Sequence, residues 1–85
     1  MESLQVIKYP LATEKSIRLM EAENKLIFVV DAKATRPDIK KAVEEVFKVK
    51  VNKVNVYTMK GQRRAYVKFA KENPAIDIAT NLGLM

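Results

Sequence analysis

The 85-residue sequence contains no cysteine and no histidine. These absences exclude disulfides, thiolate nucleophiles and imidazole bases, and they remove the usual ligands of zinc and other transition metals. Carboxylate chemistry is not favoured either, because Glu44 and Glu45 are adjacent on an expected helix and point about 100° apart. We therefore expect no catalytic site, no cofactor and no metal, and we predict that the chain is not an enzyme.

Long apolar runs are also missing. The longest wholly apolar segment, residues 26–30, is far shorter than the about 20 residues that cross a bilayer. The sequence has no basic segment followed by an apolar stretch, which is the pattern of a secretory signal. We therefore expect a cytoplasmic protein without a membrane contact. Only two Gly and three Pro interrupt a sequence that is 48% hydrophobic, a composition typical of one folded domain spanning residues 1–85.

Acidic residues are absent from one long segment. Residues 48–71 hold eight cations and no Asp or Glu, whereas the rest of the chain has eight cations against ten acids, within a net charge of +6. A basic block inside a folded pattern favours a polyanionic partner, above all nucleic acid. The alternative is that lysines only keep a sheet edge unpaired and soluble. The eight cations are Lys48, Lys50, Lys53, Lys60, Arg63, Arg64, Lys68 and Lys71.

The first half predicts two strands and a helix. Residues 3–7 indicate a brief strand that ends before Pro10, and Thr13 is placed to cap a helix over residues 14–22, in which Ile17, Leu19 and Met20 form a partial apolar stripe. Residues 25–31, KLIFVVD, predict a strand that is apolar on both alternations. That strand is expected to be central or covered on both faces.

The strongest helical signal follows over residues 37–49. Thr35 and Asp38 have the spacing of a capping box, and Pro37 stands in the first turn. The expected buried stripe is Ile39, Ala42, Val43, Val46 and Phe47.

The second half predicts a hairpin and a last helix. Strands over residues 53–59 and 63–70 are joined by residues 60–62, with Gly61 at positive φ. Pro74 opens a short helix that directs Ile76, Ile78 and Ala79 inward and ends at Gly83. If the last strand inserts between the two that flank the 37–49 helix, the fold is α+β, with a four-stranded antiparallel sheet, a split βαβ unit and short N- and C-terminal helices, as in half of a ferredoxin-like fold.

One face of this hairpin carries the residues expected to bind RNA. Arg64, Tyr66 and Lys68 on one strand lie beside Lys53, Asn55 and Tyr57 on its partner, so cations for phosphates and aromatic rings for bases share a face. The alternative is that the tyrosines lie under a helix with only their hydroxyls exposed. The turn cations Lys60, Arg63 and Arg64 have fewer packing alternatives and are better candidates for contacts.

Two other binding modules are compatible with the pattern. An RNA-recognition motif shares the element order, and Ala65-Tyr66-Val67-Lys68-Phe69 matches the end of its central-strand signature. Arg63 and Arg64 stand where that signature needs glycine and an aromatic, however. A small α+β protein-interaction or regulatory module that meets an acidic protein is the second alternative.

Short motifs from Ile7 onward follow one another in a specific order and spacing. They are Lys8-Tyr9-Pro10, Ala12-Thr13-Glu14-Lys15, residues 25–31, Ile39-Lys40-Lys41-Ala42-Val43-Glu44, Phe47, Val54-Asn55, Gly61, residues 63–69, Asp77-Ile78-Ala79 and Leu82-Gly83. In this order and spacing the motifs resemble the universal large-subunit ribosomal protein twenty-three family in its archaeal form. The short 60–62 connection differs from bacterial members, whose hairpin is extended toward the tunnel interior.

The resemblance implies a structural, cytoplasmic component of the ribosome that binds large-subunit ribosomal RNA as a monomer near the polypeptide exit tunnel. It also implies contact with the neighbouring large-subunit protein twenty-nine and a part in docking the signal recognition particle and other nascent-chain factors. Carried over by motif, the RNA contacts are Lys8, Thr13, Lys15, Asn55, Lys60, Arg63, Arg64 and Lys68. The strand pattern adds Lys53, Tyr57 and Tyr66 to this set.

Overall fold

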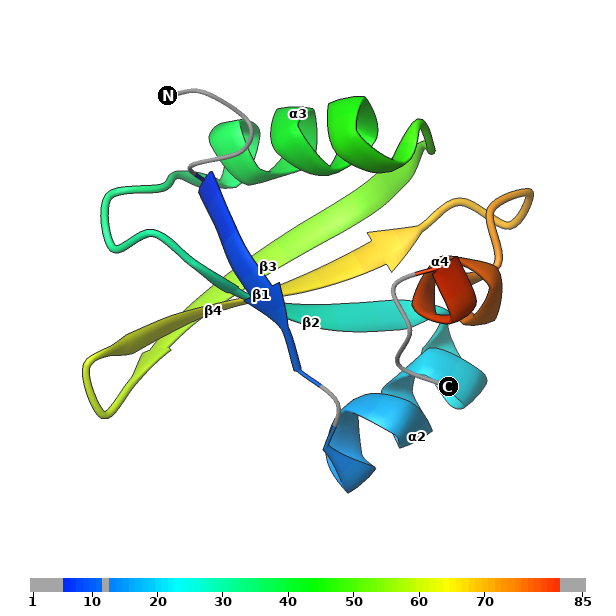
Figure 1. Cartoon of the computed structure of the whole chain (residues 1–85), viewed down its shortest axis with the longest axis horizontal. Coiled ribbons are helices and arrows are strands. Elements are labelled where there is room, and N and C mark those ends of the chain that lie inside the picture. Colours follow the sequence, from blue (N-terminus) through cyan, green and yellow to red (C-terminus); the bar gives the residue numbers. More distant parts are fainter. Residues whose placement is uncertain (1–5, 12, 82–85) are drawn as a thin grey trace.

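A computed structural model describes residues 6–11 and 13–81 of the chain. Four strands and three helices follow one another in these ranges (Figure 1). In chain order they are β1 (Ile7–Pro10), α2 (Glu14–Glu23), β2 (Lys25–Val30), α3 (Arg36–Phe47), β3 (Val51–Met59), β4 (Gln62–Phe69) and α4 (Ala75–Asn81).

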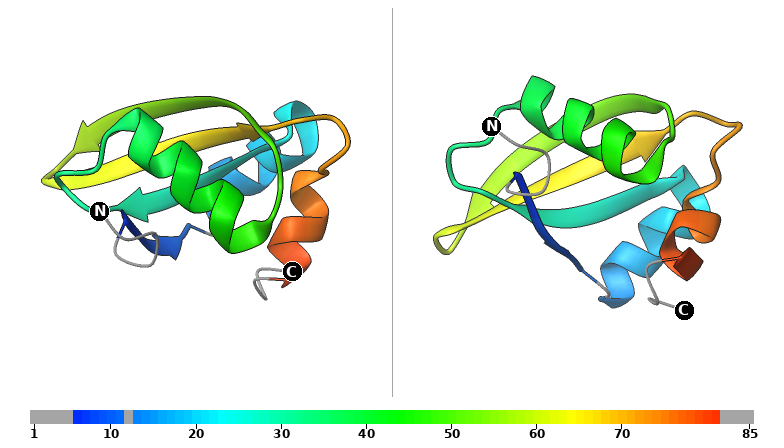
Figure 2. Two further views of the ribbon diagram at one scale, coloured as in Figure 1. Left: turned by 90° about the horizontal axis from the view of Figure 1, so that it is seen from above. Right: turned by 45° about the horizontal axis from the view of Figure 1, so that its top comes forward.

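The strands form one sheet in the order β1-β2-β4-β3, and every neighbouring pair is antiparallel. β4 lies between β2 and β3, the two strands that α3 connects (Figure 2). This is the split βαβ arrangement, so the predicted α+β fold is confirmed. β4 is central because its alternate residues Ala65, Val67 and Phe69 are buried while it pairs on both edges.

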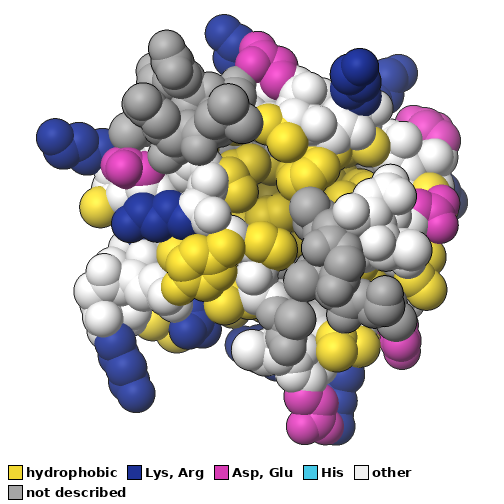
Figure 3. Space-filling model, in the orientation of Figure 1, with side chains coloured by type: hydrophobic (Ala, Val, Ile, Leu, Met, Phe, Trp, Pro, Cys, Tyr) yellow, Lys and Arg dark blue, Asp and Glu magenta, His cyan; other side chains and the backbone are white. Residues whose placement is uncertain are grey.

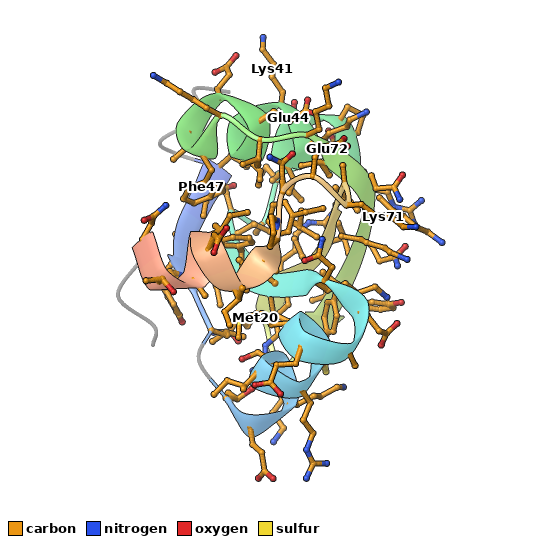
Figure 4. All side chains as sticks on the ribbon, turned by 90° about the vertical axis from the view of Figure 1, so that its right-hand side faces the viewer. Met20, Lys41, Glu44, Phe47, Lys71 and Glu72 are labelled. Atoms are coloured by element: carbon orange, nitrogen blue, oxygen red, sulfur yellow. The ribbon has the colours of Figure 1, made fainter. Side chains whose placement is uncertain are left out.

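The core lies between α3 and one face of the sheet. Ile39, Ala42 and Val43 of α3 are buried against the alternate positions of β2 and β4 that include Phe28 and Val67. The rings of Phe28 and Phe47 stack with centroids 5.7 Å apart. Figure 4 shows Phe47 between α3 and α4 and Met20 between α4 and α2, while Lys41 points outward from α3.

β2 is buried on both faces, as its sequence predicts. Leu26 and Phe28 face α3, and the intervening Ile27 and Val29 are buried on the opposite side, each only 3% exposed. A strand covered on both sides needs no polar alternation.

The predicted Thr13 cap and the predicted Thr35–Asp38 capping box are both present, and Thr13 forms a capping box as well. The Thr13 hydroxyl accepts a hydrogen bond from the Ser16 backbone N–H at the start of α2. At the start of α3, the Thr35 hydroxyl accepts from the Asp38 N–H, and the Asp38 carboxylate accepts from the Thr35 N–H at 3.2 Å. These bonds lower the pKa of the Asp38 carboxyl, because both the Thr35 backbone and side chain favour its charged form.

Asn24 ends α2 and also joins three parts of the fold. It is left-handed, with φ 57°, as expected for a helix C-cap. Its side-chain N–H group donates to the carbonyls of Phe69, Ala70 and Asn73, and its side-chain oxygen accepts from the Ala75 N–H at 2.6 Å. One side chain therefore fixes the end of β4 and the beginning of α4 against the end of α2.

Several boundaries and inward faces differ from the sequence prediction. The first strand is Ile7–Pro10, so it includes the proline that was expected to follow it; residues 3–5 lie outside the described ranges. Pro10 is tolerated because β1 is an edge strand, where a missing N–H need not break the ladder. α3 ends at Phe47 rather than at residue 49, since Lys48 adopts the left-handed conformation that ends the helix.

Three apolar side chains that were expected to face inward are exposed. Ile17, Val46 and Ile76 are 37%, 41% and 46% exposed. The three helices therefore bury narrower apolar stripes than the sequence pattern predicts. The expected helix stop at Gly83 lies outside the described residues.

Candidate RNA-binding face

The sheet face opposite α3 gathers most of the predicted binding residues. The strand register pairs Lys53 with Lys68, Asn55 with Tyr66 and Tyr57 with Arg64. All six alternate with the buried or partly buried residues on the α3 side of the sheet. α2 flanks this face and adds Lys15, whose ammonium lies 5.7 Å from the centroid of the Tyr66 ring. We call the set Lys15, Lys53, Asn55, Tyr57, Arg64, Tyr66 and Lys68 the basic sheet face.

A pocket of about 470 Å³ opens on the basic sheet face between α2 and the hairpin. Tyr57 and Tyr66 contribute to its lining; their ring centroids are 5.2 Å apart and the ring planes are nearly perpendicular, at 85°. Tyr57 is 51% exposed, whereas Tyr66 is half-buried. The alternative that both rings are covered by a helix is therefore not what the structure shows: Tyr66 lies beside α2, but Tyr57 is open to solvent.

Arg64 is held in place by a short chain of hydrogen bonds. Its Nε–H donates to Gln62 Oε1 at 2.7 Å, and Gln62 Nε2 donates to the Tyr9 hydroxyl of β1 at 2.9 Å. The terminal guanidinium N–H groups of Arg64 make no hydrogen bond within residues 6–11 and 13–81. A guanidinium oriented in this way is ready to donate to a phosphate.

Arg63 lies on the other face of the sheet. It alternates with Arg64 and Gln62, and its Nε–H donates to the carbonyl of Ala34, just before α3, at 2.9 Å. Arg63 was expected to have few packing alternatives and to be available for RNA. Instead, this hydrogen bond ties its side chain to the backbone just before α3. The two adjacent arginines therefore do not act on one surface.

The remaining predicted residues lie at the margins of the basic sheet face. Lys60 and Gly61 form the two-residue turn, both with positive φ, at 50° and 76°, and Lys8 on β1 lines a hollow beside this turn. The Thr13 hydroxyl is engaged in the cap of α2. The hairpin strands begin and end far from the turn, and the flanking cations Lys48, Lys50 and Lys71 lie at those far ends. The eight cations of residues 48–71 therefore form no single patch.

Lys25 belongs with the basic sheet face but was not predicted. It pairs in register with Lys68 and lines the same pocket as Tyr57. Its ammonium forms an ion pair with Glu23 at 3.3 Å. The sequence signal was that Lys25 shares one strand face with Ile27 and Val29. It was overlooked because the rest of β2 is uniformly apolar.

Two ion pairs join side chains of the first half to each other, Arg18 with Glu14 and Lys25 with Glu23. Neither of these two pairs uses a cation from residues 48–71. Figure 3 shows the surface of the molecule in the orientation of Figure 1. Hydrophobic side chains gather in the middle of this side, below α3, and Lys and Arg side chains lie around its rim.

Residues 6–11 and 13–81 hold no group of three or more His, Cys, Asp or Glu that could bind a metal ion. In the same part of the chain, no helix has the length and apolar character that a membrane crossing requires.

Comparison with known proteins identifies relatives along nearly the whole chain. Residues 5–80 match the family described as ribosomal protein L23. The large ribosomal subunit protein uL23 of Methanococcus aeolicus is 46% identical over 85 residues, and that of Methanococcus vannielii is 44% identical over 85 residues. Each alignment covers 99% of both chains, and the resemblance inferred from the sequence motifs is confirmed.

Proposed function

Since the chain belongs to the ribosomal protein L23 family, we propose that it is a structural constituent of the large ribosomal subunit that binds ribosomal RNA through the basic sheet face. The observation that carries this proposal is the register of β3 and β4, which aligns Lys53, Arg64 and Lys68 with two tyrosines on one surface. Membership of a family of ribosomal proteins agrees with the predicted place at the ribosome and confirms that the chain is not an enzyme.

Binding depends first on charge. Lys15, Lys53 and Lys68 supply ammonium groups, and Arg64 supplies a guanidinium whose orientation is set by Gln62. Each cation that neutralises a phosphate releases condensed counterions, so affinity falls with salt. The other side of β4 is anchored in the core, where Ala65 and Val67 are fully buried. The face thus recognises the shape of folded RNA without performing chemistry.

Protein contacts need a surface that the RNA leaves free. A groove of about 320 Å³ lies between the end of α3 and α4, lined in part by Val46, Phe47 and Ile78. We extend the proposal to a position at the polypeptide exit tunnel, with contacts to large-subunit protein twenty-nine and to the signal recognition particle. The exposed apolar side chain of Val46 in the lining of this groove supports such contacts. A Val46→Lys variant is expected to weaken capture of purified protein twenty-nine without weakening RNA binding, and unchanged capture would remove this groove from that contact.

RNA binding is tested by titrating a large-subunit RNA fragment with the whole chain at several salt concentrations. Log affinity is expected to fall linearly with log salt, by about 0.7–0.9 for each phosphate neutralised. Salt-independent or absent binding would contradict the proposal. Purification provides a second test: nucleic-acid absorbance that stays with the protein until high salt supports RNA, whereas an acidic protein partner in its place supports an interaction module.

A further inference from the structure

The pocket beside Tyr57 has features that neutralisation of phosphates does not require. Building on the proposed RNA-binding function, we propose that this pocket receives one unpaired nucleobase, stacked on Tyr57 and held at its edge by Asn55. The sheet would then recognise a single-stranded nucleotide within the RNA, in addition to the charge and shape of the backbone.

The first observation is the exposure of Tyr57. A large aromatic side chain that is 51% exposed on the open face of a sheet leaves ring surface in contact with water. Because the Tyr57 and Tyr66 planes are nearly perpendicular, neither ring is stacked on the other. Lys15 occupies the space over Tyr66 by a cation–π contact, so Tyr57 is the ring that remains available for stacking.

The second observation is the Asn55 amide. Asn55 is half-buried and lines the same pocket, yet its side chain makes no hydrogen bond within the described ranges of the chain. Its register partner is Tyr66, so the amide lies on the basic sheet face beside the rings. An amide offers both donors and an acceptor, which suits the donor and acceptor pattern at the edge of an unpaired base.

The third observation is the mixed lining. Leu19 and Met59 give the pocket apolar surface, while Lys15 and Lys25 place cations at the same site. A nucleotide has this division, with a flat and weakly polar base attached to an anionic phosphate. A base inside a duplex cannot enter, because its two faces are already stacked and its edge is already paired.

Intrinsic fluorescence tests the proposal directly, since the chain has three tyrosines and no tryptophan. Two probes are compared at equal salt: a single-stranded oligoribonucleotide of mixed sequence, and the duplex that it forms with its complement. The single strand is expected to quench the tyrosine emission of the wild-type chain, and the duplex is expected to leave it nearly unchanged. Equal quenching by both probes would overturn the proposal.

Matched variants then locate the effect. Tyr57→Leu is expected to lower affinity for the single strand by about tenfold, within the range measured when a stacking aromatic is removed, and to leave the salt slope unchanged. Tyr57→Phe keeps the ring and is expected to retain the affinity while losing most of the quenching. Circular dichroism verifies that both variants fold, and the wild-type quenching remains a test if Tyr57→Leu does not.

The outcomes separate this proposal from the function on which it rests. If the wild-type chain fails to bind the large-subunit RNA fragment, the proposed function itself is wrong. If it binds that fragment with the expected salt dependence, but Tyr57→Leu binds the single strand as tightly as wild type does, the base pocket is wrong and the phosphate-binding face stands.

Discussion

Arg63 and Arg64 are neighbours in sequence, but the structure predicts that their loss has different consequences. Arg64 projects from the basic sheet face, whereas Arg63 donates to the Ala34 carbonyl on the α3 side. Replacing each arginine separately by glutamine keeps most of the side-chain length and removes the charge. The pair therefore provides its own matched control.

For Arg64→Gln, the expected change is in RNA affinity. One lost phosphate contact lowers the salt slope by about 0.7–0.9, which at about 0.1 M salt corresponds to about five- to eightfold weaker binding. Because Arg64 is hydrogen-bonded only to Gln62 within the described residues, the stability of the fold is expected to change little.

For Arg63→Gln, the expected change is in stability. The lost bond joins a charged donor to the carbonyl of Ala34, a residue that is 0% exposed. Losing such a bond costs about 1.5 kcal/mol. In a domain of this size that lowers the melting temperature by roughly 6–12 °C. The RNA salt slope is expected to stay at its wild-type value.

The assay pairs thermal unfolding, followed by circular dichroism, with a salt titration of RNA affinity. Equal loss of RNA affinity in both variants, with equal melting temperatures, would refute the assignment of the two arginines to opposite faces.

Three further predictions concern the caps and the turn. Asn24→Ala removes the side-chain bonds to β4 and α4 and leaves a strained left-handed residue, so its free energy of unfolding in urea is expected to fall by about 3 kcal/mol. Asn24→Gly removes the same bonds without the strain and is expected to lose less. Equal losses in the two variants would exclude a contribution from strain. Lys60→Asn relieves positive φ in the hairpin turn and is expected to raise stability by roughly 0.5–1 kcal/mol in the same assay, and a decrease would contradict it. The lowered pKa of Asp38 means that its capping contribution is present above the ordinary carboxyl pKa and is lost as pH falls through the folded-state value, so NMR is expected to show Asp38 titrating below the usual range. Thr35→Ala removes the hydroxyl but keeps the backbone N–H, which is the larger cause, so this variant is expected to raise the pKa of Asp38 only part of the way back.

Local sequence signals predicted the fold because they agreed with the long-range arrangement. Structure is specified within a few residues by the Thr13 and Thr35 caps, by the continuous apolar run of β2 and by the glycine turn. The insertion of β4 followed from its apolar alternation together with the hand of the crossover. Pro10 misled because the ban on proline in a sheet does not apply at an edge strand.

The site was less predictable, because its residues are brought together by register. Alternation gave the six residues of β3 and β4, but it also places Arg63 on the opposite face, a consequence that its position beside the turn obscured. Lys25 joins the face only through pairing with β4, and the multiple bonds of Asn24 reach residues more than 40 positions away. Such contacts leave no pattern in a short stretch of sequence.

Directed cleavage of RNA tests most directly whether the basic sheet face binds it. The chain has no cysteine, so a single introduced cysteine can carry a tethered iron reagent that generates hydroxyl radicals. Met59→Cys places the reagent on the basic sheet face while keeping every cation, and Lys41→Cys places it on the exposed side of α3. In the bound large-subunit RNA fragment, strong cleavage from position 59 and weak cleavage from position 41 are predicted. Stronger cleavage from position 41, or equal cleavage from both, would contradict the account.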